Sequence, residues 1–330
     1  MNVMYTCDNN YIWLAGISMI SLFENNRHMR DLSVFLLGEN ISGDNKEVLN
    51  EIACRYDRKI TVINVPQIEI PSSLVSSRWP LSAFTRLFSG QLLPDEIHKI
   101  LYLDCDTVVT GNIELLEQVS FGDNVVLGVK DCVSGVYKQN IGLEKKSLYI
   151  NAGVILFDMD TFRKIDIHRM IEVYMNKYMN FINYADQDIL NGVMKNKIGE
   201  LPPEYDVMTI DAVYSHKEIM QLRHPTNFYE EVELAEAVNK PKIIHYTTNM
   251  LTVRPWFTNT DHPFASEFKK YMQMSPWKDR PLGKMVFNTK ESMIVWMVGK
   301  LPKGLAHRIL GLIHSELKPR VINVRAKMRV

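Results

Sequence analysis

The segment Lys99-Ile-Leu-Tyr-Leu-Asp104 constrains the fold most, because it is apolar or aromatic along most of its length. A strand of this kind is covered on both faces only inside a sheet that is flanked by helices. Upstream, residues 2–6 and 32–37 have the pattern of strands, and residues 10–24 between them carry apolar side chains at helical spacing. This alternation predicts an α/β fold with a mostly parallel sheet between helices.

The same alternation continues along the chain and then stops. After Pro281 the composition becomes basic, Met-rich and amphipathic, so we expect one domain over residues 1–283 and a tail over residues 284–330. Within the domain we expect further strands at 60–65, 147–157 and 242–246, and helices at 79–89, 158–178 and 185–194.

Composition bounds the class of protein. A hydrophobic content of 46% over 330 residues is enough for a large core. The cysteines lack CxxC spacing, which predicts neither a zinc site nor a disulfide framework and fits a reducing compartment. The first residues have no basic or apolar region of a signal peptide, so we expect a cytoplasmic protein. The cysteines are Cys7, Cys54, Cys105 and Cys132.

Charge is distributed unevenly along the chain. The formal net charge of zero argues against a nucleic-acid binder, yet the tail carries ten Lys or Arg against two Glu, a net +8, and the rest of the chain carries −8. The apolar stretches of the tail, such as Met293–Val298, are too short to span a bilayer. We therefore expect the tail to anchor the protein peripherally on the anionic inner face of the plasma membrane. The alternative is that the tail packs on the body or on a partner chain.

Asp104-Cys105-Asp106 directly follows the buried strand and is the first candidate site. Positions i and i+2 of an extended chain point to one side, so the two carboxylates face one spot and call for a cation such as Mg²⁺ or Mn²⁺. The carboxyl end of a central strand is where ligands bind in open α/β sheets. His245 ends another strand-like run, and an imidazole ligand would favour Mn²⁺. The alternatives are a polar turn after a strand and a core histidine.

Six motifs occur in order over residues 1–260 and together resemble glycosyltransferase family 8, the retaining enzymes that include bacterial lipopolysaccharide galactosyl- and glucosyltransferases and the glycogenins. Any one of the motifs is weak, but the ordered set is specific. The motifs are Tyr5-Thr-Cys-Asp8-Asn-Asn10-Tyr11, Ala83-Phe-Thr-Arg86-Leu-Phe, Leu93-Pro-Asp with the segment from Lys99 to Asn112, Asn151-Ala-Gly153, Asp186-Gln187-Asp188 and His245-Tyr246.

The resemblance implies a GT-A type, Rossmann-like mixed sheet and a metal-dependent, retaining transfer of galactose or glucose from a UDP-hexose to a saccharide or glycolipid acceptor of a bacterial surface glycan. It also implies roles for individual residues. Asp104, Asp106 and His245 would bind Mn²⁺, with Mg²⁺ as a possible substitute, and Asp131 would contact the acceptor. Catalysis would rest on Gln187 and Asp186. The nucleotide would be bound by Thr6, Asp8, Asn10, Tyr11 and Asp104, and the donor sugar by Arg86, Asn151, Ala152, Gly153, Asp186 and Gln187.

The chain departs from the family's pattern after the histidine. Family members commonly follow His-Tyr with a glycine and then Lys-Pro-Trp, whereas here Arg254-Pro-Trp256 stands three residues further on. The resemblance then implies that Arg254, with Thr248, contacts the diphosphate, because arginine also pairs with phosphate oxygens.

Each of these residues could instead have a purely structural role. Arg86 could be a solvated helix residue, Tyr11 could pack at a helix start, Asp186 and Asp188 could cap the helix at 185–194, and Asn151 could begin an ordinary strand.

Two other functions of the whole protein are alternatives to the glycosyltransferase. A sugar nucleotidyltransferase should show a Gly-rich basic loop after the first strand, which Cys7-Asp-Asn-Asn10 is not. A catalytically silent sugar-nucleotide binder is the other.

Overall fold

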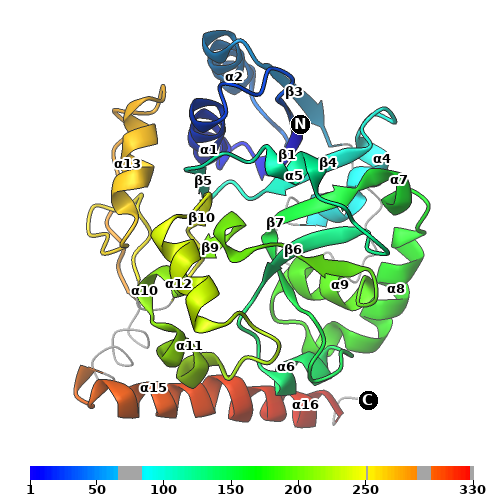
Figure 1. Cartoon of the computed structure of the whole chain (residues 1–330), viewed down its shortest axis with the longest axis vertical. Coiled ribbons are helices and arrows are strands. Elements are labelled where there is room, and N and C mark those ends of the chain that lie inside the picture. Colours follow the sequence, from blue (N-terminus) through cyan, green and yellow to red (C-terminus); the bar gives the residue numbers. More distant parts are fainter. Residues whose placement is uncertain (66–83, 250–251, 288–298, 328–330) are drawn as a thin grey trace.

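The computed structural model describes residues 1–65, 84–249, 252–287 and 299–327, and its centre is a mixed seven-stranded sheet (Figure 1). β1 pairs in parallel with β2 and β4, and β2 with β3. β7 runs antiparallel to both β4 and β6, which confirms the predicted mixed sheet. The strand order is β3 (Lys59–Asn64), β2 (Ser33–Glu39), β1 (Asn2–Asp8), β4 (Lys99–Leu103), β7 (Ile150–Asp158), β6 (Val126–Lys130) and β8 (Ile198–Glu200).

A second sheet of three short strands joins the first one where β4 ends. It has the order β5 (Thr107–Val109), β10 (Ile243–His245) and β9 (Val207–Met208). Only three residues separate β4 from β5, so the chain leaves the large sheet and enters the small one within the Asp-Cys-Asp segment. This junction positions the candidate site.

The two faces of the large sheet bury two separate cores. Along β1 and β4, Val3 and Leu101 face one core while Met4 and Tyr102 face the other, as expected for a strand with period two. α1 (Ile12–Asn25) covers the first face and is buried along most of its length. α8 (Ile167–Tyr178) and α9 (Ala185–Val193) cover the second face (Figure 1).

Two helix predictions differ from the structure. The helix expected at 158–178 is divided into α7 (Met159–Phe162) and α8, because the Asp166 side chain accepts a hydrogen bond from the backbone N–H of Arg169 and starts a new helix there. The helix expected at 79–89 is, in its described part, a 3₁₀ helix (Thr85–Phe88) that leads into one α-helical turn, α4 (Ser89–Leu92), beyond the expected end. Residues 79–83 lie outside the described ranges.

The helix α2 (Gly43–Tyr56) packs against β3 and α1. The remaining described elements are α5 (Leu115–Gln118), α6 (Gly135–Asn140), α10 (Thr209–Val213), α11 (His216–Arg223), α12 (Glu231–Asn239), α13 (Ala265–Gln273) and the 3₁₀ turns Met179–Phe181 and Pro203–Tyr205. Cys7, Cys54, Cys105 and Cys132 are all free thiols, as the sequence predicts.

Within the tail, residues 303–327 form one long helical rod along the base of the molecule (Figure 1). α15 (Lys303–Gly311), a π-helical turn (Leu312–Leu317) and α16 (Lys318–Lys327) follow without a break, and residues 303–327 are called the C-terminal helix below. The expected apolar stretch Met293–Val298 lies outside the described residues.

One face of the C-terminal helix packs against the body. Ser134 Oγ donates to the Ser315 carbonyl at 2.8 Å, and Asn140 Nδ2 donates to the Pro319 carbonyl at 2.7 Å. A Cβ added at Gly311 would collide with the carbonyl oxygen of Gln221, so the helix lies directly on α11. The described part of the tail therefore has the packing that the alternative expectation foresaw, and no helix among the described residues is long and apolar enough to cross a membrane.

Candidate active site

Asp104, Asp106 and His245 come together at the junction of the two sheets. β10 pairs antiparallel with β5 and places His245 opposite Thr107, and the Tyr246 N–H donates to the Asp106 carbonyl at 2.9 Å. The Nε2 atom of His245 lies 3.2 Å from Asp106 Oδ1 and 3.6 Å from Asp104 Oδ2. One ligand atom from each of the three side chains lies within 4.8 Å of the others. Two carboxylates and an imidazole at this spacing fit a divalent cation such as Mn²⁺.

Electrostatics around His245 favour positive charge at this spot. Burial alone would lower the pKa of His245, but Asp206 and Asp106 outweigh it, and the pKa lies well above its usual value. Burial alone would raise the pKa of Asp106, but His245 and Arg254 outweigh it, and that pKa is lowered. A metal ligand must be a neutral imidazole, so a divalent cation would replace the proton that the same carboxylates stabilise.

Asp206 was missed by the sequence analysis and completes this cluster. Its Oδ1 lies 3.0 Å from His245 Nδ1, and its side chain is completely buried. A carboxylate on Nδ1 fixes the N–H there and leaves the Nε2 lone pair facing Asp104 and Asp106. Asp206 immediately precedes β9, which pairs with β10, so only the strand pairing brings it beside His245. No motif in the sequence marks it.

Gly153 forms the floor of the cluster. Its carbonyl accepts a hydrogen bond from the Asp104 N–H at 2.7 Å, which follows from the antiparallel pairing of β4 and β7. A Cβ at this position would collide with the Cε1 atom of His245 and approach Asp104 Oδ2 to 2.9 Å. A glycine is therefore needed here for the metal ligands to lie against the strand.

Arg86 connects the cluster to the donor-sugar candidates. Its Nη2 pairs with Asp104 Oδ1 at 2.8 Å, and its guanidinium lies over the Tyr102 ring, 4.2 Å from the centroid. Its Nε lies 3.1 Å from Asp186 Oδ2 as an ion pair without hydrogen-bond geometry, and its Nη1 donates to the Ala152 carbonyl. Burial raises the pKa of Asp186 to about 6 even though Arg86 opposes that rise. Arg86 is thus a buried bridge and not a solvated helix residue.

Gln187 links β7 to Asp131. Its Nε2 donates to Asp131 Oδ2 at 2.8 Å, and its Oε1 accepts from the Ala152 N–H at 3.1 Å. Asn151 Nδ2 also approaches Asp131 Oδ2, at 3.4 Å, and its Oδ1 accepts from the Gly153 N–H at 2.8 Å. The predicted sugar-contacting residues of β7 and α9 therefore form one hydrogen-bonded group with the predicted acceptor residue.

Asp188 has the structural role that the alternative assigned to it. Its Oδ2 accepts hydrogen bonds from the backbone N–H of Asn183 at 2.8 Å and of Tyr184 at 2.7 Å, just before α9. Tyr137 and Tyr149 donate their hydroxyls to the same carboxylate. These hydrogen bonds make Asp188 a structural residue that fixes the start of α9. It orients Gln187 only indirectly, by holding the helix that carries Gln187.

The predicted nucleotide loop lies at the carboxyl end of β1. Thr6 Oγ1 lies 3.1 Å from the Tyr102 hydroxyl, which donates to Asp104 Oδ1 at 2.5 Å. Asp8 Oδ1 accepts from the Asn10 N–H at 2.7 Å and from the Tyr11 N–H at 3.2 Å, so it closes a tight turn before α1. The Tyr11 side chain remains 50% exposed, which leaves its ring free to stack on a planar ligand.

Arg254 reaches the metal cluster despite the three extra residues before it. Its Nη1 lies 3.5 Å from Asp106 Oδ2, and its guanidinium is held over the Trp256 ring, 4.6 Å from the centroid. Thr248 is exposed at the start of this loop, whose residues 250–251 lie outside the described ranges.

Comparison with known proteins agrees with this geometry. The model of "Glycosyl transferase family 8" matches residues 2–260. General stress protein A of Bacillus subtilis (strain 168) is 25% identical over 84% of this chain and 94% of its own length. Lipopolysaccharide 1,2-glucosyltransferase of Escherichia coli (strain K12) is 26% identical over 84% of this chain and 79% of its own length.

Solved structures show the same fold. The galactosyltransferase LgtC, in a complex with donor and acceptor sugar analogs, superposes with a TM-score of 0.68 at 22% identity, covering 84% of this chain and 96% of that one. The matched family model covers most of the chain, including every residue of the predicted site. The chain therefore belongs to glycosyl transferase family 8.

Proposed function

We propose that the protein is a metal-dependent, retaining hexosyltransferase that moves galactose or glucose from UDP to a saccharide or glycolipid acceptor of a bacterial surface glycan. The observation that carries the proposal is the cluster of Asp104, Asp106 and His245, with Arg254 beside it. The name of the relative that is a lipopolysaccharide glucosyltransferase supports the acceptor class. Family membership and the lack of a Gly-rich phosphate loop argue against a sugar nucleotidyltransferase.

The cluster fits a divalent cation, for which Mn²⁺ is the proposed ion. When bound, such an ion stabilises the negative charge that develops on the diphosphate of the leaving UDP. Arg254 would add charge-assisted hydrogen bonds to the same diphosphate, because its guanidinium already lies next to Asp106. Tyr11 would stack on the uracil through its exposed ring, with Thr6, Asp8 and Asn10 beside it.

Retention without an enzyme nucleophile requires attack from the face that UDP leaves. Gln187 occupies the position where an enzyme nucleophile would be expected, but an amide is a poor nucleophile. Its Nε2 and Oε1 atoms are also engaged, by Asp131 and by the Ala152 N–H. We therefore propose same-face attack in which Gln187 and Asp186 orient the donor sugar. The departing phosphate oxygen then accepts the proton of the acceptor hydroxyl.

UDP release from a panel of UDP-hexoses tests the proposed function. Asp106→Ala should abolish Mn²⁺-dependent UDP release from the preferred donor, because it removes a ligand of the proposed ion, while the far-UV circular dichroism stays unchanged. Asp123→Ala, which removes an exposed carboxylate between β5 and β6, is the matched control and should behave as the wild type. Unchanged turnover in Asp106→Ala would refute the metal assignment, and a chain that binds UDP-hexose without any turnover would be a silent binder.

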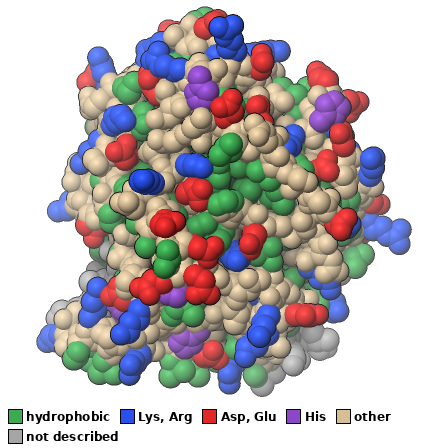
Figure 2. Space-filling view, in the orientation of Figure 1, with side chains coloured by type: hydrophobic (Ala, Val, Ile, Leu, Met, Phe, Trp, Pro, Cys, Tyr) green, Lys and Arg blue, Asp and Glu red, His purple; other side chains and the backbone are tan. Residues whose placement is uncertain are grey.

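We also propose that the C-terminal helix rests on an anionic membrane surface. The face turned away from the body exposes apolar side chains at helical spacing, and the tail carries a net charge of +8. Hydrophobic and basic side chains both lie along the lower edge of the molecule (Figure 2). The exposed apolar residues are Leu305, Ile309, Leu312, Ile313, Leu317, Val321 and Val324.

Co-sedimentation with phosphatidylglycerol vesicles tests this surface. The pair Leu305→Ser and Ile309→Ser should release the full-length protein from the vesicles, because each buried apolar side chain is worth roughly 1.5–3 kcal/mol. Val232→Ser, at an exposed apolar position on α12, is the control and should sediment as the wild type. Equal sedimentation of all three proteins would contradict the proposal.

A further inference from the structure

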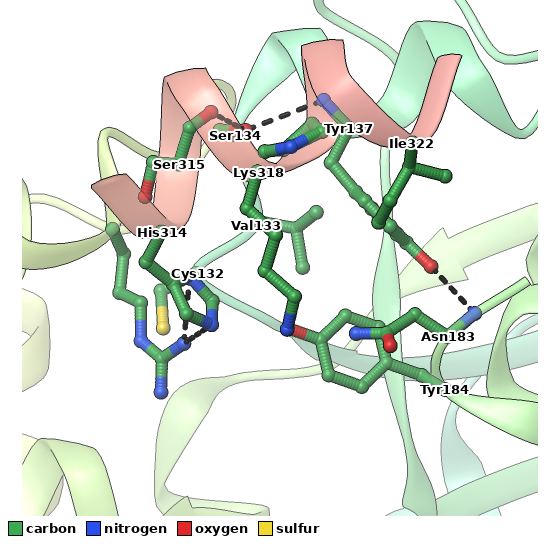
Figure 3. Close-up of a pocket in the computed structure, with 12 residues that line it drawn as sticks. Cys132, Val133, Ser134, Tyr137, Asn183, Tyr184, His314, Ser315, Lys318 and Ile322 are labelled. Carbon is green, nitrogen blue, oxygen red and sulfur yellow. Dashed lines mark hydrogen bonds between the residues drawn. The ribbon is translucent and has the colours of Figure 1, made fainter. Parts of the chain in front are cut away.

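A cavity of about 30 Å³ lies between the body and the C-terminal helix (Figure 3). The body contributes Cys132, Tyr184 and Arg223 to its wall, and the helix contributes His314 and Lys318. A single water molecule needs about 10–15 Å³ of such volume, so the cavity has room for about two waters or one compact chemical group. A sugar ring does not fit inside it.

The cavity adjoins the acceptor side of the candidate active site. Cys132 directly follows Asp131, whose carboxylate accepts the hydrogen bond from Gln187 Nε2 at 2.8 Å. Tyr184 directly precedes α9, the helix that carries Gln187. Asp131 is also near enough to Arg223 to interact with it electrostatically, so a small group held in the cavity would lie close to Asp131.

Among the described residues, no carboxylate forms an ion pair with either cation of the cavity, and Asp131 acts on Arg223 only as a nearby charge. Arg223 ends α11, and only its Nη1 makes a hydrogen bond with a described residue, to the ring nitrogens of His314 at 3.1 and 3.3 Å. Lys318 is exposed, has no ion-pair partner within the described ranges, and points toward Tyr184 (Figure 3). Two cationic side chains thus face one small cavity.

The acidic side chains of this interface are engaged elsewhere. Glu218 pairs with Lys303 at 2.6 Å and lies 3.8 Å from His307. Glu316 pairs with Arg320 at 2.8 Å and lies 3.5 Å from His224. Neither glutamate lines the cavity, and both are paired with cations other than Arg223 and Lys318.

His314 contacts Arg223 without adding a charge to the cavity. Burial, with Arg223 and Lys318 nearby, lowers its pKa to about 4, so the imidazole is neutral at pH 7. A neutral imidazole has one nitrogen that can accept the Arg223 hydrogen bond, so His314 helps to hold the guanidinium at the cavity. Guanidinium and ammonium N–H groups around one compact space match the oxygens of a tetrahedral anion, which arginine binds in a bidentate manner.

We propose that this cavity is an anion subsite and that it binds a phosphate group carried by the saccharide that receives the hexose. Assigning the phosphate to the acceptor rests on the hexosyltransferase function proposed above, whereas the anion subsite itself does not. Arg223 lies inside residues 2–260, which the family model matches, whereas His314 and Lys318 lie outside them, so the C-terminal helix would supply part of this recognition.

Calorimetric titration of the full-length protein at fixed ionic strength tests the subsite, with glucose 6-phosphate, inorganic phosphate and glucose as probes. Glucose 6-phosphate and phosphate should bind and glucose should not. Arg223→Gln and Lys318→Ala should each weaken glucose 6-phosphate binding by about tenfold to a hundredfold, as for a lost charge-assisted hydrogen bond. Lys318 is exposed, so its variant tests the subsite even if Arg223→Gln disturbs folding.

Lys269→Ala on α13 is the matched control, because it removes an exposed lysine far from the C-terminal helix (Figure 1) and should bind as the wild type. Wild-type affinity in both cavity variants would overturn the subsite. Displacement of glucose 6-phosphate by phosphatidylglycerol vesicles would overturn the acceptor assignment in favour of a lipid headgroup. UDP release from UDP-hexose is measured in parallel, since its absence would overturn the proposed function while the titration still decides the subsite.

Discussion

Asp206→Asn should weaken metal binding without removing any metal ligand. Asp206 is completely buried, and its carboxylate lies 3.0 Å from His245 Nδ1, on the opposite side of the ring from Asp104 and Asp106. The negative charge holds the N–H on Nδ1 and makes Nε2 a better electron donor. An asparagine keeps the size of the side chain and can still accept from Nδ1, but it removes the charge.

The expected loss is about tenfold to a hundredfold in Mn²⁺ affinity, or about 1.4–2.7 kcal/mol, which is the usual effect of losing such a partner. Isothermal titration of the full-length protein with MnCl₂ measures it directly. Circular dichroism and thermal unfolding show whether the fold is kept.

Asp211→Asn provides the matched control. Asp211 is also buried and lies five residues further along, but its carboxylate accepts from the Met208 N–H at 3.1 Å and makes no contact with His245. This variant should lose stability and keep its Mn²⁺ affinity. If Asp206→Asn binds Mn²⁺ like the wild type, or if Asp211→Asn weakens binding equally, the orienting role of Asp206 is wrong.

Three further predictions concern other parts of the molecule. Gly153→Ala should lower Mn²⁺ affinity at least as much as Asp206→Asn, measured by the same titration, because its Cβ would displace the His245 ring. Gln187→Ala should slow hexosyl transfer and leave the product anomer unchanged by NMR, and a covalent glycosyl adduct in mass spectra would instead support double displacement. His262 has its pKa lowered by burial to about 4 from 6.5, so the unfolded chain takes up this proton first, and up to about 3 kcal/mol of stability should be lost as the pH falls from 6.5 to 4. His262→Gln should flatten that part of the curve of unfolding free energy against pH, and an unchanged slope would contradict the assignment.

The central strands were predictable because their side chains are buried on both faces. The run at Lys99–Leu103 has no polar face that could be turned to solvent, so its position in the interior of the sheet follows from the sequence alone. The direction of β7 does not follow, because the same apolar run would fill a parallel or an antiparallel position. Helix breaks were also hidden, since a single Asp166 side chain decides where α8 begins.

The ligands of the proposed metal site were predictable, whereas the groups that hold them were not. Asp104 and Asp106 stand two residues apart on one segment, and their convergence needs only the geometry of an extended chain. Asp206 acts through the pairing of β9 with β10, about 40 residues from His245 along the chain, and pairing between distant strands leaves no local pattern. Gly153 looks like part of a sugar-binding motif, but its lack of a side chain is also a condition for the metal cluster.

The proposed donor side and the proposed phosphate subsite are built from partly different parts of the chain. The proposed donor side lies on the ends of β1, β4 and β7 and on α9, all inside residues 2–260. One wall of the cavity beside Asp131 comes from the C-terminal helix, which lies outside that range. Substitutions at His314 or Lys318 can change what that cavity binds without moving Asp104, Asp106 or His245. Exchanging the C-terminal helix for that of a relative should therefore alter which acceptors are used while the UDP-hexose preference stays the same. A changed donor preference in such a chimera would show that the two sides are coupled.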